Sequence, residues 1–253
     1  MTEPLRRVAL RIAADEHEQT VARLLGLAPD GFEEQDRDGG IELAVYTDAA
    51  GEKLIRGAFP GATSEAVEPC WENAWRAFHR PVSAGGIWIG PPWETPPPGP
   101  SVVIDPGRAF GTGAHPTTRL CVELLAGAPR GSLVDVGCGS GVLAIAAARL
   151  GFGPLLAVDN DPVAVDTTRA NAQVNGVELE ARVLDALNEP IPAADLAVAN
   201  VLLAPVETVL GRLESRVAIT SGYLEGQVPA HGGWERTATV TLGDWAADRF
   251  DRR

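Results

Sequence analysis

The feature that most constrains this chain is a glycine-rich turn between a predicted strand and a predicted helix. The segment Val134–Gly141 reads VDVGCGSG, and apolar residues lie on both sides of it. Glycine lacks a side chain, so a turn with several glycines lets a ligand approach the backbone closely. We therefore expect a ligand at this turn; the alternative is a turn that is only tight.

The spacing of these glycines separates two classes of nucleotide-binding turn. The dinucleotide fingerprint G-x-G-x-x-G requires a third glycine where this chain has Val142. Gly137, Gly139 and Gly141 instead form G-x-G-x-G, which is typical of methyltransferases that use S-adenosylmethionine. The turn is thus interpreted as a site for that cofactor, and a nicotinamide oxidoreductase is disfavoured.

Residues 101–253 alternate between short apolar segments and amphipathic ones. We predict strands at 133–136, 155–158, 183–184, 196–199 and 217–220, with a late edge strand at 237–242. Helices are predicted at 141–150, 162–175 and 204–214. This alternation indicates an α/β fold of Rossmann-like type, a mostly parallel sheet with helices on both faces.

Polar residues end three of these predicted strands, where ligands of parallel sheets bind. Asp159 ends the second strand and is placed to accept both ribose hydroxyls. Asp185 follows the third strand and either meets the adenine amino group or is an ordinary loop residue. Asn200 ends the fourth strand, beside the methyl group to be transferred. Asp161 precedes Pro162 and is expected only to cap a helix.

A second motif lies upstream, at residues 105–118, and reads DPGRAFGTGAHPTT. Its glycines and prolines predict a loop that leads into a helix starting near Thr117. Thr118 then lies in the first helical turn, where hydroxyl and free N–H groups are available to a ligand. His115 is either a catalytic base or, as we favour, a residue that organises the loop.

The first hundred residues predict a small domain and a connector. Alternating apolar residues at 8–12 and 41–45 predict two strands around a helix that Asp15 and Glu18 would cap, which gives a small α+β domain at residues 1–57. Residues 58–100 are predicted to be a connector with a helix at 64–80 and an irregular proline-rich end at 90–100. The methyltransferase domain then spans 101–253.

Composition limits the partners and the compartment. The formal net charge is −13, which disfavours direct binding to nucleic acid. The three cysteines form no disulfide framework and no pair at metal-ligand spacing, so no metal is expected. No signal-peptide core and no apolar run of membrane-spanning length is present. We expect a monomeric, cytoplasmic protein.

Taken together, these motifs resemble the methyltransferases of ribosomal protein L11 of bacteria. The similarity runs from Asp105 to Gln227 and includes the upstream loop, the glycine turn and the segment Asn200–Pro205. It extends more weakly through Trp71, Trp75 and residues 91–93. The long loop motif is the most specific part of this resemblance.

The resemblance implies both architecture and activity. It implies a ferredoxin-like substrate-recognition domain, a linker helix and a class I methyltransferase domain. It also implies that cofactor contacts include Thr118, Gly137, Asp159 and Asn200, and that methyl groups go to lysine side chains and the N-terminal amine of the basic ribosomal protein. We expect Asn200 to orient the amine, without a dedicated strong base.

Three departures from the family pattern keep other functions open. Ala114 replaces a threonine, Leu203 an alanine and Tyr223 an isoleucine, and we expect Leu203 and Tyr223 to lie near the substrate entrance. One alternative is a methyltransferase of the same fold that acts on another protein or a small amine. Another is a non-catalytic ribosome-binding module, which the intact glycine turn, Asp159 and Asn200 disfavour.

Overall fold

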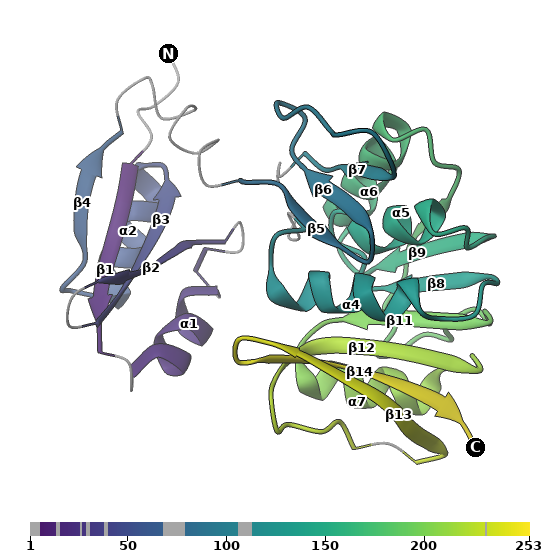
Figure 1. Cartoon of the computed structure of the whole chain (residues 1–253). Coiled ribbons are helices and arrows are strands. Elements are labelled where there is room, and N and C mark those ends of the chain that lie inside the picture. Colours follow the sequence, from purple (N-terminus) through teal and green to yellow (C-terminus); the bar gives the residue numbers. More distant parts are fainter. Residues whose placement is uncertain are drawn as a thin grey trace. The chain divides into compact units, whose positions relative to one another are not determined.

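The computed structural model describes residues 6–13, 16–25, 27–28, 31–37, 40–67, 79–105, 113–230 and 232–253. The chain divides into two compact units, Met1–Phe78 and His79–Arg253 (Figure 1). Each unit has its own sheet and its own hydrophobic core, and each is described here by itself.

In its described residues, the first unit has a four-stranded antiparallel sheet and two helices. Its elements in chain order are β1 (Arg6–Ile12), α1 (His17–Leu25), β2 (Glu33–Arg37), β3 (Gly40–Thr47), α2 (Ala49–Ala58) and β4 (Thr63–Ala66). The strands lie in the order β2-β3-β1-β4. This element order and this strand order are those of a ferredoxin-like unit.

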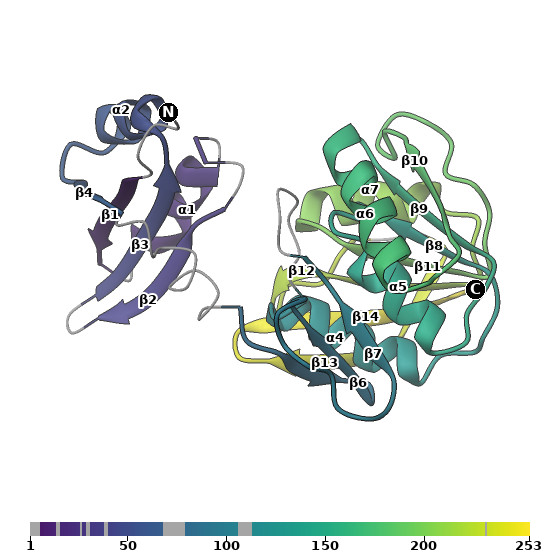
Figure 2. The same cartoon turned by 90° about the horizontal axis from the view of Figure 1, so that it is seen from above.

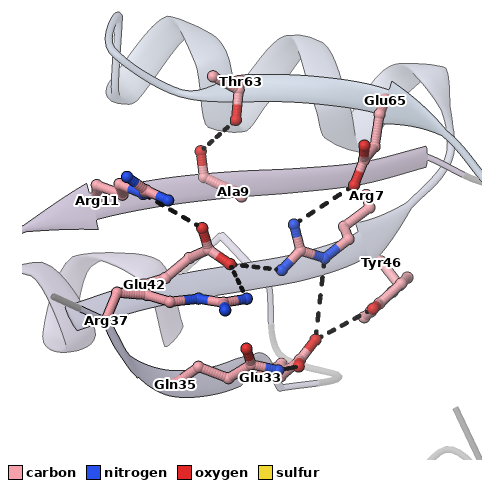
Figure 3. A network of polar contacts seen from close by, with 10 residues as sticks. All are labelled: Arg7, Ala9, Arg11, Glu33, Gln35, Arg37, Glu42, Tyr46, Thr63 and Glu65. Carbon is pink, nitrogen blue, oxygen red and sulfur yellow. Dashed lines mark hydrogen bonds and ion pairs between the residues drawn. The ribbon is translucent and has the colours of Figure 1, made fainter. Parts of the chain in front are cut away.

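The two faces of this sheet differ because side chains alternate along each strand. Val8 and Leu43 lie in a core to which α1 contributes Leu24 and α2 contributes Ile55. The other face carries charged side chains from β1, β2 and β3 (Figure 3). Glu42 is only 8% exposed there.

Arginine side chains surround Glu42 on that polar face. Arg7 lies 2.8 Å from Glu42, while Arg37 and Arg11 lie 3.4 and 3.5 Å away (Figure 3). The hydrogen bond from Arg7 is the main reason that the pKa of Glu42 lies below its ordinary value. Three arginine side chains thus stabilise the ionised form of this buried carboxylate.

The first unit continues past residue 57, where the sequence predicted its end. Asp48 caps α2, since its Oδ1 accepts a hydrogen bond from Gly51 N at 2.8 Å. β4 then pairs with β1 and closes the sheet, so residues 63–66 form a strand where a helix was predicted. The remainder of that predicted helix, at 68–78, lies outside the described residues, as does Asp15.

The second unit contains a seven-stranded sheet in the order β10-β9-β8-β11-β12-β14-β13. Its strands are β8 (Leu133–Val136), β9 (Leu155–Asp159), β10 (Glu180–Val183), β11 (Leu196–Asn200), β12 (Val217–Leu224), β13 (Trp234–Leu242) and β14 (Trp245–Arg252). The first five are parallel, whereas β14 runs antiparallel to both of its neighbours. The prediction of a mostly parallel α/β sheet is confirmed.

Helices cover both faces of this sheet (Figure 2). They are α4 (Pro116–Ala126), α5 (Val142–Arg149), α6 (Pro162–Val174) and α7 (Leu203–Arg212). Leu133 packs in a cluster with residues of α4 and α5, whereas its neighbour Val134 packs in another with residues of α7. Adjacent strand residues therefore face opposite layers, as a sheet buried on both sides requires.

A second, three-stranded sheet precedes α4. It consists of β5 (Val82–Ala84), β6 (Ile87–Gly90) and β7 (Ser101–Val103), in that order. The proline-rich residues 91–100 join β6 to β7 without helix or strand, as predicted. These strands belong to the compact unit that begins at His79.

β14 has no counterpart among the predicted strands. It separates β12 from β13, and β13 is the edge strand that the sequence predicted. Among the described residues, no helix combines the length and the apolar character needed to cross a membrane.

Candidate functional site

The glycine turn joins β8 to α5 at the carboxyl end of the parallel strands. Gly137, Gly139 and Gly141 have φ values of 74°, 52° and 79°, which L-residues with side chains rarely adopt. A Cβ atom on Gly137 would lie 2.5 Å from Val201 Cγ1, so the turn also packs too closely for another residue. The positive φ values explain why all three positions are glycine, and the close contact adds a second reason at Gly137.

Asp159 closes β9 and is bonded to the glycine turn. Its Oδ2 accepts a hydrogen bond from Gly139 N at 3.0 Å, and its Oδ1 accepts one from Asp161 N at 3.0 Å. Each carboxylate oxygen has a second lone pair, so the group can still accept hydroxyl hydrogens. Asp161 caps α6 through Val163 N, as predicted. The role of Asp159 toward a ribose stays a prediction.

Asn200 and Thr118 meet at the carboxyl end of β11. Asn200 Nδ2 donates to Thr118 Oγ1 at 3.3 Å, and Thr118 lies in the first turn of α4 and is 2% exposed. This bond fixes the amide so that its oxygen points away from the hydroxyl. The structure therefore brings together two residues that the sequence placed in separate motifs.

His115 organises the start of α4. It is the N-cap residue, and its Nδ1 lies 2.8 Å from Thr117 Oγ1 and 3.4 Å from Thr117 N. Its ring also packs edge-on against Trp245, with centroids 4.9 Å apart. These contacts support the organising role over that of a catalytic base. Residues 106–112 of the same motif lie outside the described residues.

Asp185 holds its own loop after β10. Its Oδ1 accepts from Leu187 N at 3.0 Å and its Oδ2 from Asn188 Nδ2 at 2.7 Å. The hydrogen bond from Asn188 is the main reason that the pKa of Asp185 is lowered. The structure gives the residue a local role, and a contact with adenine stays a prediction.

Asp135 is a site residue that the sequence reasoning did not single out. It is 1% exposed; its Oδ2 accepts from Ala144 N at 3.1 Å, and its Oδ1 has no hydrogen-bond partner among the described residues. Burial is the main cause that raises its pKa to about 7. A lone carboxylate inside the apolar strand at 133–136 was the available signal.

The two departures expected near a substrate entrance lie in different environments. Tyr223 is 2% exposed, and its hydroxyl lies 2.7 Å from Thr220 Oγ1 and 3.0 Å from Asp248 Oδ2. Leu203 begins α7 and is half-buried, whereas Leu202 before it is exposed. Because Tyr223 is a core residue, the expectation that it lies at an entrance was wrong.

These residues fit S-adenosylmethionine. The turn of three positive-φ glycines leaves backbone open to a ligand, and Asp159 adds a carboxylate with unused acceptor capacity beside it. α5 begins at Val142, and its N-cap residue Gly141 supplies no side-chain cap. Gly137, Gly139, Gly141 and Asp159 would hold the cofactor at the strand ends.

Several known proteins are similar to this chain in sequence. The family model described as Ribosomal protein L11 methyltransferase (PrmA) matches residues 40–247. A ribosomal protein L11 methyltransferase of Alkalilimnicola ehrlichii is 42% identical over 204 residues, which cover 74% of this chain and 69% of that protein. Its counterpart in Gloeobacter violaceus is 40% identical over 192 residues, 70% of this chain and 61% of that protein.

A solved structure is similar as well. The ribosomal protein L11 methylase of Lactobacillus delbrueckii subsp. bulgaricus has a TM-score of 0.63 and 28% identity, and the match covers 69% of this chain and all of that one. The glycine turn, Asp159 and Asn200 all fall within the residues that the family model matches. The chain therefore belongs to the ribosomal protein L11 methyltransferase family, with a class I fold whose cofactor is S-adenosylmethionine.

Proposed function

We propose that this chain transfers methyl groups from S-adenosylmethionine to lysine side chains and the N-terminal amine of ribosomal protein L11. The observation that carries the proposal is the position of Asn200. It ends β11, next to the glycine turn that ends β8, and its amide nitrogen is held by Thr118. An oriented amide oxygen thus lies at the strand ends, where an acceptor amine would arrive.

The chain's residues mainly have to align the reacting atoms. S-adenosylmethionine supplies a methyl group that is bonded to a sulfonium. The sulfur leaves as a neutral thioether, so the leaving group needs no acid. The acceptor amine must be neutral, although lysine in water has a pKa of about 10.4. Burial beside a cation disfavours the protonated amine. Asn200 would accept a hydrogen bond from this amine and direct its lone pair toward the methyl group.

We assign recognition of the ribosomal protein to the first unit. Residues 1–57 contain 12 acidic and 7 basic residues, a net charge of −5, which suits a basic partner. The predicted contacts of Gly137, Gly139, Gly141, Asp159, Asp185 and Thr118 with the cofactor belong to the same proposal. We place the reaction in the cytoplasm and assign it to a single copy of the chain, without direct nucleic acid contacts.

Intact-mass spectrometry of ribosomal protein L11 tests the activity. After incubation with this chain and S-adenosylmethionine, we expect mass steps of about 14 Da, one for each methyl group that replaces a hydrogen on nitrogen. Asn200→Ala should lower the rate about tenfold or more, because one oriented hydrogen bond is lost. Gln173→Ala, an exposed change on α6, is the control and should leave the rate unchanged.

The outcomes distinguish the possible errors. A wild-type chain that binds S-adenosylhomocysteine but adds no mass to ribosomal protein L11 would show that the acceptor is another protein or a small amine. A chain that binds no cofactor would contradict the methyltransferase proposal. Full turnover by Asn200→Ala would contradict the role of Asn200 alone.

A further inference from the structure

Side chains of α6 connect two segments of the candidate site that are distant in sequence. Asn171 is 2% exposed. Its Oδ1 accepts a hydrogen bond from Asp105 N at 3.2 Å, and its Nδ2 donates to Ser140 O at 2.9 Å. Ser140 belongs to the glycine turn, and Asp105 begins the motif that leads to α4. One buried amide therefore connects the first residue of the upstream motif to the glycine turn.

Asn175, one helical turn further along, offers a comparison. Its Oδ1 accepts from Val103 N at 2.8 Å, and its Nδ2 donates to Val103 O at 2.6 Å and to Asn171 O at 2.8 Å. These bonds hold β7 against α6. Asn175 and Asn171 are both buried and both bind the backbone of residues 103–105, but of the two it is Asn171 that bonds to the glycine turn.

Thr168 strengthens the attachment of the turn to α6. Its hydroxyl donates to Gly139 O at 3.0 Å, and a Cβ atom on Gly141 would lie 2.8 Å from its Cγ2. Thr168 and Asn171 are three residues apart and share one face of the helix. The carbonyls of Gly139 and Ser140 are thus both held by α6.

We propose that Asn171 is a positioning residue for cofactor binding, which fixes the glycine turn to the start of the loop that precedes Thr118. The ligand named here rests on the proposed function. The amide uses its donor for the turn and its acceptor for Asp105, so loss of the donor removes the hydrogen bond by which Asn171 holds the Ser140 carbonyl. The turn then relaxes away from the conformation that receives the cofactor.

The test replaces each asparagine with aspartate, which has the same shape and keeps the acceptor but loses the donor. The measurement is the Kd of S-adenosylhomocysteine by calorimetry, with the Tm of each variant recorded without ligand. Asn171→Asp should raise the Kd about tenfold or more, because the ionised carboxylate loses the hydrogen bond to Ser140 O and is repelled by that carbonyl. The matched control Asn175→Asp should change the Kd less than about twofold. It should nevertheless lower the Tm by about as much as Asn171→Asp does.

A steady-state measurement adds a second readout. Asn171→Asp should raise the KM for S-adenosylmethionine and leave kcat at saturating cofactor within about threefold of the wild type, because the loss is in binding. If an aspartate variant does not fold, Asn171→Ser and Asn175→Ser replace the pair, with the same ranking expected.

Two results would overturn the proposal. Equal Kd changes in the two variants would assign Asn171 a purely structural role, and an unchanged Kd in Asn171→Asp would remove any role in binding. Failure of the wild type to bind S-adenosylhomocysteine is a different result, since it contradicts the proposed function before any variant is compared.

Discussion

Asn200 Nδ2 lies 3.3 Å from Thr118 Oγ1, and this bond joins the end of β11 to the first turn of α4. The two residues lie 82 positions apart in the sequence. An amide that could rotate would offer either its nitrogen or its oxygen to an incoming amine. Since the hydroxyl engages the nitrogen, the oxygen is the end of the amide that the proposed reaction leaves for the acceptor amine.

This bond predicts a specific difference between two substitutions of Thr118. Thr118→Val keeps the shape but removes the hydroxyl, and should lower kcat about tenfold because the Asn200 amide loses its orientation. Thr118→Ser keeps the hydroxyl and should retain most of kcat. Single-turnover rates at saturating cofactor provide the measurement. Equal rates for the valine and serine variants would show that the bond does not matter for transfer.

Asp159 is expected to dominate cofactor affinity. Asp159→Ala removes the acceptor for Gly139 N and the carboxylate proposed to bind the ribose, so the Kd of S-adenosylhomocysteine should rise about 100-fold. Asp161→Ala is the matched control, since it removes only the cap of α6 and should cost about 1 kcal/mol of stability. Calorimetry that finds the two Kd values alike would contradict the assignment.

The buried carboxylate of Asp135 predicts a pH dependence of stability. The pKa of this carboxyl is raised from 3.8 to about 7. Its contribution to the unfolding free energy is therefore fully present below pH 3.8, where the group is neutral in both states, and is lost as the pH rises through 7. Asp135→Asn has no charge to bury. Its advantage in unfolding free energy over the wild type should grow by roughly 3 kcal/mol between pH 5 and pH 8. Urea unfolding at several pH values measures this, and a constant difference would contradict it.

Arg130 predicts a local contribution to stability. It donates to Leu150 O at 2.6 Å, to Leu125 O at 3.1 Å and to Ala126 O at 3.0 Å, so one guanidinium binds carbonyls at the ends of both α4 and α5. Arg130→Met should lower the unfolding free energy by about 1–3 kcal/mol.

Arg182 provides the control for this change. It is exposed and pairs with Glu180 at 2.6 Å, and a surface ion pair of this kind adds little to stability. Chemical denaturation of Arg130→Met and Arg182→Met should therefore give clearly different midpoints. Equal midpoints would show that the carbonyl contacts of Arg130 add little.

Tyr223 is expected to affect stability and not acceptor choice. Its hydroxyl is buried against Thr220 and Asp248, so Tyr223→Phe leaves polar atoms unpaired and should cost about 1–3 kcal/mol. The number of methyl groups added should stay the same, because the ring does not reach the surface. A changed count in the intact-mass spectrum would place Tyr223 in substrate selection.

The central strands could be predicted because their short apolar sequences are typical of a sheet that helices cover on both faces. β8, β9 and β11 are short, mainly apolar runs, and the polar residues that end β9 and β11 located Asp159 and Asn200 at the carboxyl edge of the sheet. β14 was missed because Asp248, Arg249 and Asp251 interrupt its apolar residues. Asp248 is tolerated inside because Thr239 on the neighbouring strand β13 and Tyr223, 25 residues away on β12, both donate hydrogen bonds to it.

Asn171 could not be identified from the sequence for a related reason. In an amphipathic helix an asparagine ordinarily faces solvent, and local spacing does not reveal a buried partner such as Ser140 O. Likewise, the sequence did not predict α2 and β4. Residues 63–66 form a strand because they pair with β1, which lies more than 50 positions earlier in the chain. Contacts over long sequence separations decide these cases, and local patterns do not encode them.

The ionic cluster on the open sheet face of the first unit has a consequence for colloidal behaviour. Both described helices of that unit pack on the opposite face, so none of the unit's described helices covers the polar one, on which the sheet of a second molecule could stack. Stacking there would strip water from Arg7, Arg37 and Glu42 while their partners are already committed to one another (Figure 3). The paired charges thus disfavour self-association through this polar face.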